Sequence, residues 1–312
     1  MEGSRKVLYA GLVGNVLVAA TKFVAASVTQ SAAMLSEAVH SLVDTSNEVL
    51  LLYGARRAER PPDEAHPLGH GREVYFWSFV VSLVIFAAGA GFSLYQGVLH
   101  VIAPHPIESV LWSYVVLGAS VLFESGSWWV AFHEFRRRKG ARGYLQAAQE
   151  TKDPATVIVF LEDSAALVGL ALALAGTAGS QYLDMPVLDG VASIAIGLLL
   201  GVVAAFLARE NKQLLIGESA RPELVESIRQ LAAQEKGVAN FNGLLTFQLA
   251  PREVVVALSL DFDRGLRAAE LQATVDQLES RIRRKHPEII LLLVKPQEPD
   301  VYERRHATRW QR

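Results

Sequence analysis

Six long apolar stretches constrain this chain more than any other feature of its sequence. They cover residues 7–28, 31–52, 75–98, 111–132, 156–178 and 187–207. A helix needs about 20 predominantly apolar residues to cross the hydrocarbon core of a bilayer, so each stretch is long enough to span a membrane once. The first stretch is longer than the apolar part of a secretory signal peptide, and we expect it to remain as a helix. The sequence therefore predicts an α-helical membrane protein with six transmembrane helices.

Positive charges are confined to alternate connections between these stretches. The connection after the second stretch contains Arg56, Arg57, Arg60 and Arg72, and the connection after the fourth contains the basic run 136–139. Lysine and arginine near the ends of spans are retained on the cytoplasmic side, so we expect both termini in the cytoplasm. The chain has no cysteine, and we find no targeting segment. We therefore expect a multi-pass protein of a bacterial inner (plasma) membrane.

Charged residues gather after the last apolar stretch, which indicates a second domain outside the membrane. Helical and strand periodicities there predict helices at 222–236 and 266–286 and strands at 240–249, 253–263 and 289–295. We expect a transmembrane domain over residues 1–210, a cytoplasmic α/β domain over 211–299 and a flexible tail over 300–312.

Composition limits the chemistry of any site. Because there is no cysteine, a metal ion must bind to His, Asp, Glu or Asn side chains. The net charge of −2 argues against a basic surface for phosphates, so we expect no nucleic-acid partner. No phosphate-binding Gly-x-x-x-x-Gly-Lys motif occurs, and we expect no organic cofactor.

The second apolar stretch is too polar for a helix that faces only lipid. It contains Glu37, His40, Asp44 and Asn47 at spacings of three and four residues, which places all four on one helical face. Imidazole and carboxylate one turn apart suit Zn²⁺ and also accept Mn²⁺, Fe²⁺ or Co²⁺. The alternative is a polar stripe that neighbouring helices satisfy. We favour a metal site, because ionisable groups inside a span are costly unless they are paired or functional.

Three further acids lie in apolar stretches. Glu162 and Asp163 are adjacent in the fifth stretch, so their side chains point about 100° apart on a helix. We choose Asp163 as the metal ligand and expect Glu162 to pair elsewhere. Glu124, in the fourth stretch, has three open roles: metal ligand, proton relay or hydrogen-bond acceptor.

A short segment after the second stretch carries another candidate site. Asp63, His66 and His70 lie three and four residues apart and combine hard and borderline metal ligands. A polar turn with incidental histidines explains the spacing equally well.

These segments together resemble the cation diffusion facilitator family. The resemblance rests on His40-Ser41-Leu42-Val43-Asp44, on His66-Pro67-Leu68-Gly69-His70-Gly71-Arg72 and on the acid of the fifth stretch, and it covers nearly the whole chain. Lys152-Asp153-Pro154 with Leu161-Glu162-Asp163-Ser164 is similar to the zinc-transporter-nine-like branch.

The resemblance implies a homodimer that exports divalent cations from the cytoplasm by alternating access, in exchange for protons, with a ferredoxin-like (metallochaperone-like) dimerisation domain. It implies a four-ligand site to which His40, Asp44 and Asp163 correspond. The fourth family position is Val159 here, which cannot bind a metal, so Glu162, Glu124, Asn47 or water must replace it. It also implies a dimer charge lock, for which Arg72 and Glu218 are the nearest candidates.

We therefore expect a Zn²⁺ or other divalent-cation transporter rather than an enzyme. An intramembrane metalloenzyme is the main alternative, but no His-Glu-x-x-His motif is present. The third hypothesis is a scaffold subunit that does not transport metal. It is motivated by the missing fourth ligand.

Overall fold

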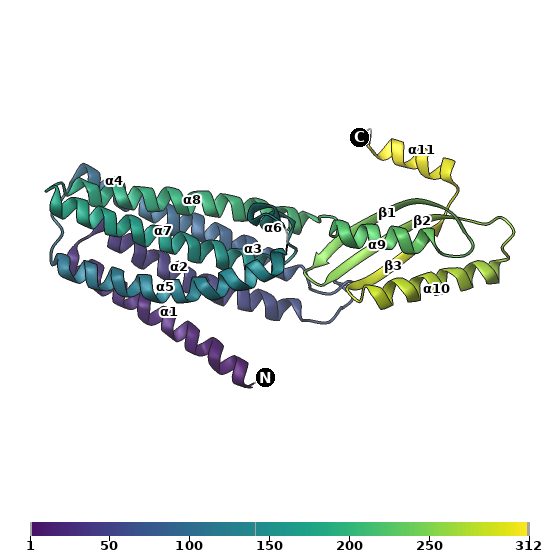
Figure 1. Ribbon diagram of the computed structural model, residues 1–312, viewed down its shortest axis with the longest axis horizontal. Coiled ribbons are helices and arrows are strands. Elements are labelled where there is room, and N and C mark those ends of the chain that lie inside the picture. The colour runs from purple at the N-terminus through teal and green to yellow at the C-terminus, as the bar shows by residue number, and fades with distance from the viewer. Residues whose placement is uncertain (1, 141, 311–312) are drawn as a thin grey trace. The chain divides into compact units, whose positions relative to one another are not determined.

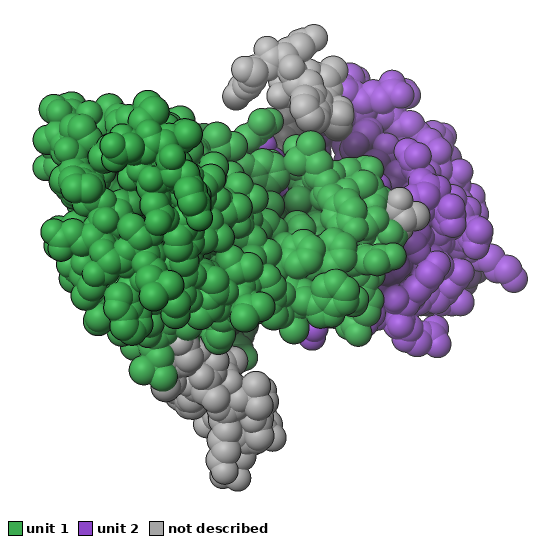
Figure 2. Space-filling view, turned by 60° about the vertical axis from the view of Figure 1, so that its left-hand side comes forward, with its two compact units in different colours: residues 1–212 green, residues 213–312 purple. Residues whose placement is uncertain are grey.

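The computed structural model describes residues 2–140 and 142–310, with side chains described between residues 15 and 305 except at 138 and 141. Within this range the chain forms two compact units, Met1–Lys212 and Gln213–Arg312 (Figure 2).

The first unit is helical, and Figure 1 shows its long helices lying side by side. The segments are α1 (Glu2–Thr29), α2 (Ala32–Ala58), α3 (Glu73–Val84), the π-helical η1 (Ile85–Gly91), α4 (Phe92–Ile102), α5 (Val110–Lys139), α6 (Tyr144–Glu150), α7 (Pro154–Tyr182) and α8 (Val187–Ile216). Helix α2 packs against α1, α3, α4 and α7, so it lies at the centre of the bundle.

Four helical segments are long and apolar enough to cross a membrane. They are Glu73–Ile102, which joins α3, η1 and α4, together with Val110–Arg137, Pro154–Tyr182 and Val187–Ile216. In α1 the described apolar part, Asn15–Thr29, is shorter, and α2 does not meet the same criterion. The polar face of α2 lowers its hydropathy, although its 27 residues make it about 40 Å long.

Small residues allow α4 and α8 to approach closely. A Cβ atom added at Gly197 of α8 would lie 2.7 Å from the Leu94 side chain, and one added at Gly190 would lie 3.0 Å from the Gly97 carbonyl oxygen. Ser193 lies between these glycines and donates a hydrogen bond to the Ser93 carbonyl oxygen at 2.8 Å. The small residues of α8 therefore form a packing surface.

The second unit is a three-stranded sheet with helices. Its elements are α9 (Pro222–Ala233), β1 (Val238–Ala250), β2 (Glu253–Phe262), α10 (Ala268–Lys285), β3 (Ile289–Pro296) and α11 (Pro299–Trp310). The strand order is β1-β2-β3, with β1 antiparallel and β3 parallel to β2. Ile228, Val256, Leu258, Leu278 and Ile282 are buried between the sheet and helices α9 and α10. The order of helices and strands predicted for this part of the chain is confirmed.

Helix α11, over residues 299–310, covers most of the segment that the sequence predicts as a flexible tail. Pro299 and Asp300 at its start are favourable there: proline fits the first turn of a helix and an acid complements the helix dipole. Tyr302 also packs against Gly243 of β1. These local signals explain why the polar sequence is helical.

Candidate metal-transport site

The polar face of α2 begins at a well-capped helix start. Ser31 accepts a hydrogen bond from the Met34 backbone amide at 3.0 Å, as an N-cap residue does. From this start Glu37, His40 and Asn47 are buried, and Asp44 is 25% exposed. His40 Nδ1 lies 3.4 Å from Asp44 Oδ1. The four side chains predicted for one face therefore point into the bundle or its margin.

His40 lacks the partners that a purely structural histidine would have. Among the residues that the structure describes, neither ring nitrogen of His40 has a hydrogen-bond partner, and the same holds for Asp44 Oδ1. An unsatisfied buried polar atom costs about 1–3 kcal/mol. A metal ion bound to these atoms would offset this cost.

Lys22 of α1 supplies a buried positive charge beside this face. Its Nζ lies 3.4 Å from Glu37 Oε2 and 3.7 Å from Glu124 Oε1 of α5, and it donates a hydrogen bond to Ser41 Oγ at 2.7 Å. Lys22 is fully buried, so it does not reach the lipid headgroups as a lysine near a helix end often does. The sequence signal for it was a lysine within an apolar stretch.

Asp44, Glu124 and Asp163 line one small pocket. Asn15, Val18, Ser41 and Ser127 complete its lining. Ser127 of α5 donates a hydrogen bond to Asp163 Oδ2 at 2.9 Å and so fixes the α7 carboxylate. Nothing in the sequence distinguished Ser127 from other serines.

Glu162 and Asn47 lie together outside this pocket. Asn47 Nδ2 donates a hydrogen bond to Glu162 Oε1 at 2.6 Å between α2 and α7, and both side chains are buried. Val159 is 40% exposed. The structure thus separates the adjacent acids: Asp163 lines the pocket and Glu162 pairs with α2.

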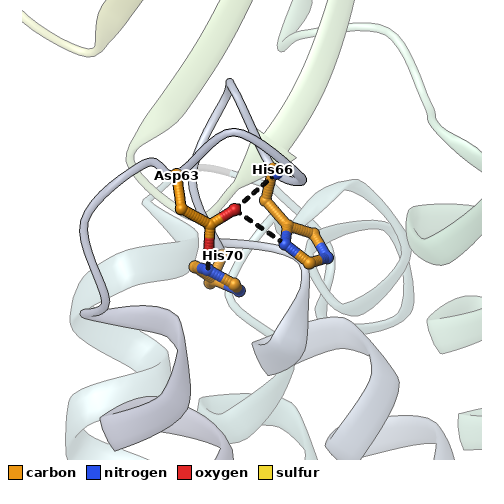
Figure 3. A group of neighbouring side chains, drawn as sticks. All are labelled: Asp63, His66 and His70. Atoms are coloured by element: carbon orange, nitrogen blue, oxygen red, sulfur yellow. Dashed lines mark hydrogen bonds and ion pairs between the residues drawn. The ribbon is translucent and has the colours of Figure 1, made fainter.

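The loop residues are closer to a metal-binding arrangement. Asp63 Oδ1 lies 3.1 Å from His66 Nδ1, and Asp63 Oδ2 lies 3.0 Å from His70 Nε2 (Figure 3). Each residue offers a ligand atom within 4.8 Å of the other two, and among the described residues this is the one such group of three. His40, Asp44 and Asp163 are not gathered this tightly.

Asp63 contacts both histidines of this loop through its carboxylate. Hydrogen bonds from His70, and then from the backbone and side chain of His66, lower the pKa of the Asp63 carboxyl group to about 2. Gly69, with φ of +82°, provides the turn that brings His70 back towards Asp63. A fixed carboxylate with two imidazoles is a ligand set that Zn²⁺ accepts.

Comparison with known protein families gives this geometry a context. The model described as the cation efflux transmembrane domain matches residues 8–216. The chain belongs to the cation efflux family. A second model, described as the cytoplasmic domain of cation efflux proteins, matches residues 220–295. The predicted resemblance to cation diffusion facilitators is confirmed.

Relatives of known name support the predicted branch of this family. The proton-coupled zinc antiporter SLC30A9, mitochondrial, is 32% identical in Xenopus laevis, over 93% of this chain and 59% of the frog protein. The Homo sapiens protein of that name is 36% identical, over 84% of this chain and 46% of the human one. The manganese efflux system protein MneP of Bacillus subtilis is 22% identical over 94% of this chain and 96% of its own length. The chain thus spans about half the length of the SLC30A9 proteins.

These relatives correct one expectation. The frog, mouse and human relatives are mitochondrial by name, and this finding overturns the expectation of a bacterial inner (plasma) membrane. The absence of cysteine was too weak a signal for a source membrane. A multi-pass membrane protein is supported by the matched transmembrane domain and by the four apolar helical segments.

Proposed function

We propose that this protein is a secondary transporter that exports a divalent metal cation, with Zn²⁺ as its main cargo, in exchange for protons. The observation that carries the proposal is buried His40, whose ring nitrogens have no hydrogen-bond partner among the described residues. It lies one helical turn from Asp44, beside a pocket that Asp44 and Asp163 both line. Relatives named as proton-coupled zinc antiporters support this cargo and counter-ion.

The cargo would bind to His40, Asp44 and Asp163, with Glu124 as the fourth ligand. Glu124 is favoured over Glu162 and Asn47 because it lines the same pocket as Asp44 and Asp163, whereas Glu162 and Asn47 bond to each other. Lys22 would release Glu124 to the metal while keeping Glu37 as its partner. A small rotation of α2 against α7 would gather these ligands.

Proton exchange follows from the chemistry of the ligands. Imidazole and carboxyl groups must lose protons to bind a metal ion, so metal binding releases protons and proton entry releases metal. Alternating exposure of such a site couples the two fluxes without nucleotide hydrolysis.

The proposal also covers the number of membrane spans and the fold of the cytoplasmic domain. Helices α1 and α2 would complete six spans, with the lipid-facing side of α2 apolar and its polar face turned inward. The sheet order and the parallel β2–β3 pair agree with a ferredoxin-like (metallochaperone-like) dimerisation domain over residues 211–299, after a cation-transport domain over residues 1–210. Asp63, His66 and His70 would form a second, accessory metal site.

Uptake of Zn²⁺, Mn²⁺, Fe²⁺ and Co²⁺ into vesicles that contain the purified protein and an imposed proton gradient tests this function. We expect gradient-driven uptake, fastest for Zn²⁺, and a loss of at least tenfold in Asp44→Ala and Asp163→Ala. Asp184→Asn, which removes an exposed acid outside the pocket, is the matched control and should transport normally. Absence of uptake for every metal in a folded dimer would favour the scaffold or enzyme alternatives.

A further inference from the structure

The end of α4 contributes to a pocket that the proposed transport site does not use. Its polar lining consists of Gln30, Ser31, Gln96, His100 and His105, and apolar side chains complete it. No lysine or arginine is among these ten lining residues, all within the described part of the chain. The pocket therefore offers two imidazole rings and no lysine or arginine charge that would repel a cation.

His100 has the features of a metal ligand without a metal. It is 4% exposed, and its Nε2 atom is buried without a hydrogen-bond partner among the described residues. The backbone of Pro186 lies beside the ring, where it can act as a hydrogen-bond acceptor. Histidine ligands are commonly oriented in this way, with one ring nitrogen bonded to a backbone carbonyl group and the other left for the metal.

A fixed carboxylate faces His100. Asp189 Oδ2 lies 4.0 Å from His100 Nε2. At the start of α2, Asp189 Oδ1 accepts a hydrogen bond from Ser31 Oγ at 2.6 Å, and Oδ2 accepts from the backbone amides of Ala32 at 2.5 Å and Ala33 at 3.3 Å. Two ligands on a tetrahedral Zn²⁺ are about 3.4 Å apart, so a shift of roughly half an ångström would bring these atoms to ligand distance.

His105 supplies a second imidazole from the connection that follows α4. Its ring centroid lies 4.3 Å from that of His100, and the side chain is exposed. It can therefore turn a nitrogen towards the pocket without disturbing the helices. Two imidazoles and a carboxylate form a ligand set typical of Zn²⁺.

We propose that His100 and His105, with Asp189, form a further divalent-metal site at the opposite end of the membrane domain from the Asp63 loop. The continuous helical segment Glu73–Ile102 has 30 residues and extends about 45 Å. His70 lies just before its start, and His100 lies in its last turn. The site would receive cargo on the far side of the membrane, and only this role rests on the proposed function. Because Asp189 also holds the start of α2, a bound ion would link α4 and α8 to the helix that carries His40.

Zinc stoichiometry of the full-length protein in lipid nanodiscs tests this site. Equilibrium dialysis at neutral pH would compare the wild type with His105→Gln, His100→Gln and His133→Gln. His133 is the matched control, because it is also an exposed histidine whose ring packs on a tryptophan, Trp129, of its own helix. We expect His105→Gln and His100→Gln each to lose one zinc equivalent per protomer and His133→Gln to lose none.

Wild-type stoichiometry in a folded His105→Gln protein would overturn the proposal. His105 is exposed, so this variant stays informative even if His100→Gln fails to fold. The assay needs no transport. If the variants lose the zinc equivalent but wild-type vesicles take up no metal, the metal site is supported and the proposed transport function is contradicted. If wild-type vesicles transport metal but the variants keep the wild-type stoichiometry, the transport function is supported and the metal site is contradicted.

Discussion

Loss of Lys22 should destabilise the helical unit. It is the buried cation between Glu37 and Glu124, and Lys22→Met would leave two buried carboxylates without it. Breaking a buried ion pair on one side costs about 3–5 kcal/mol, so we expect a clearly lower thermal midpoint in detergent. Lys212→Met, at an exposed position, should leave the midpoint unchanged. Equal midpoints for the two variants would show that Lys22 has no structural role.

Asp63 should remain a negatively charged metal ligand of the loop at neutral pH. Its pKa of about 2 lies below the ordinary aspartate value of about 3.9. The carboxylate is therefore ionised over the whole range from pH ~5 to ~8. We expect Asp63→Asn to weaken zinc binding at the loop at least tenfold at every pH in this range, as measured by calorimetric titration.

Glu64→Gln is the matched control for the loop titration, because Glu64 is exposed and adjacent to Asp63. Its zinc affinity should equal that of the wild type. If Asp63→Asn also binds zinc normally, the loop is a polar turn and the histidines are incidental.

At the scale of elements, Gly169 of α7 leaves room for the Glu37 carboxylate of α2. A Cβ atom added at Gly169 of α7 would collide with Glu37 Oε1, whereas one added at Gly126 of α5 would meet nothing within 4 Å. We expect Gly169→Ala to displace Glu37, lower the thermal midpoint and slow transport. Gly126→Ala should be neutral or slightly stabilising, since alanine favours helix by up to about 1 kcal/mol over glycine. A Gly169→Ala protein with a normal midpoint would contradict this packing.

The polar face of α2 and the elements of the α/β unit could be predicted from the sequence, because both leave a periodic pattern in it. The face of α2 follows from spacings of three and four residues, and the small α/β unit follows from strand and helix patterns. Contacts between distant helices could not be predicted in this way: Lys22 with Glu37, Ser127 with Asp163, and the separation of Glu162 from Asp163 depend on tertiary packing. Helix α11 was missed because its polar sequence carries little hydrophobic periodicity.

At the scale of the whole molecule, the family resemblance implies a dimer charge lock, for which Arg72 and Glu218 are the nearest candidates. It remains a prediction based on the family resemblance. We expect charge reversal in Arg72→Glu or Glu218→Arg to reduce the dimer fraction in detergent by several-fold, as measured by mass photometry, and the double variant to restore it. Failure of the double variant to recover dimers would mean that the two residues do not pair.

The proposed function requires divalent metal and protons to exchange through the site of His40, Asp44 and Asp163. The most direct test records the internal pH of sealed proteoliposomes when Zn²⁺ is added outside, with no gradient imposed. We expect proton efflux that accompanies zinc uptake in the wild type and in Asp184→Asn, and that disappears in Asp44→Ala. Zinc uptake without proton movement, or proton movement that survives Asp44→Ala, would contradict it.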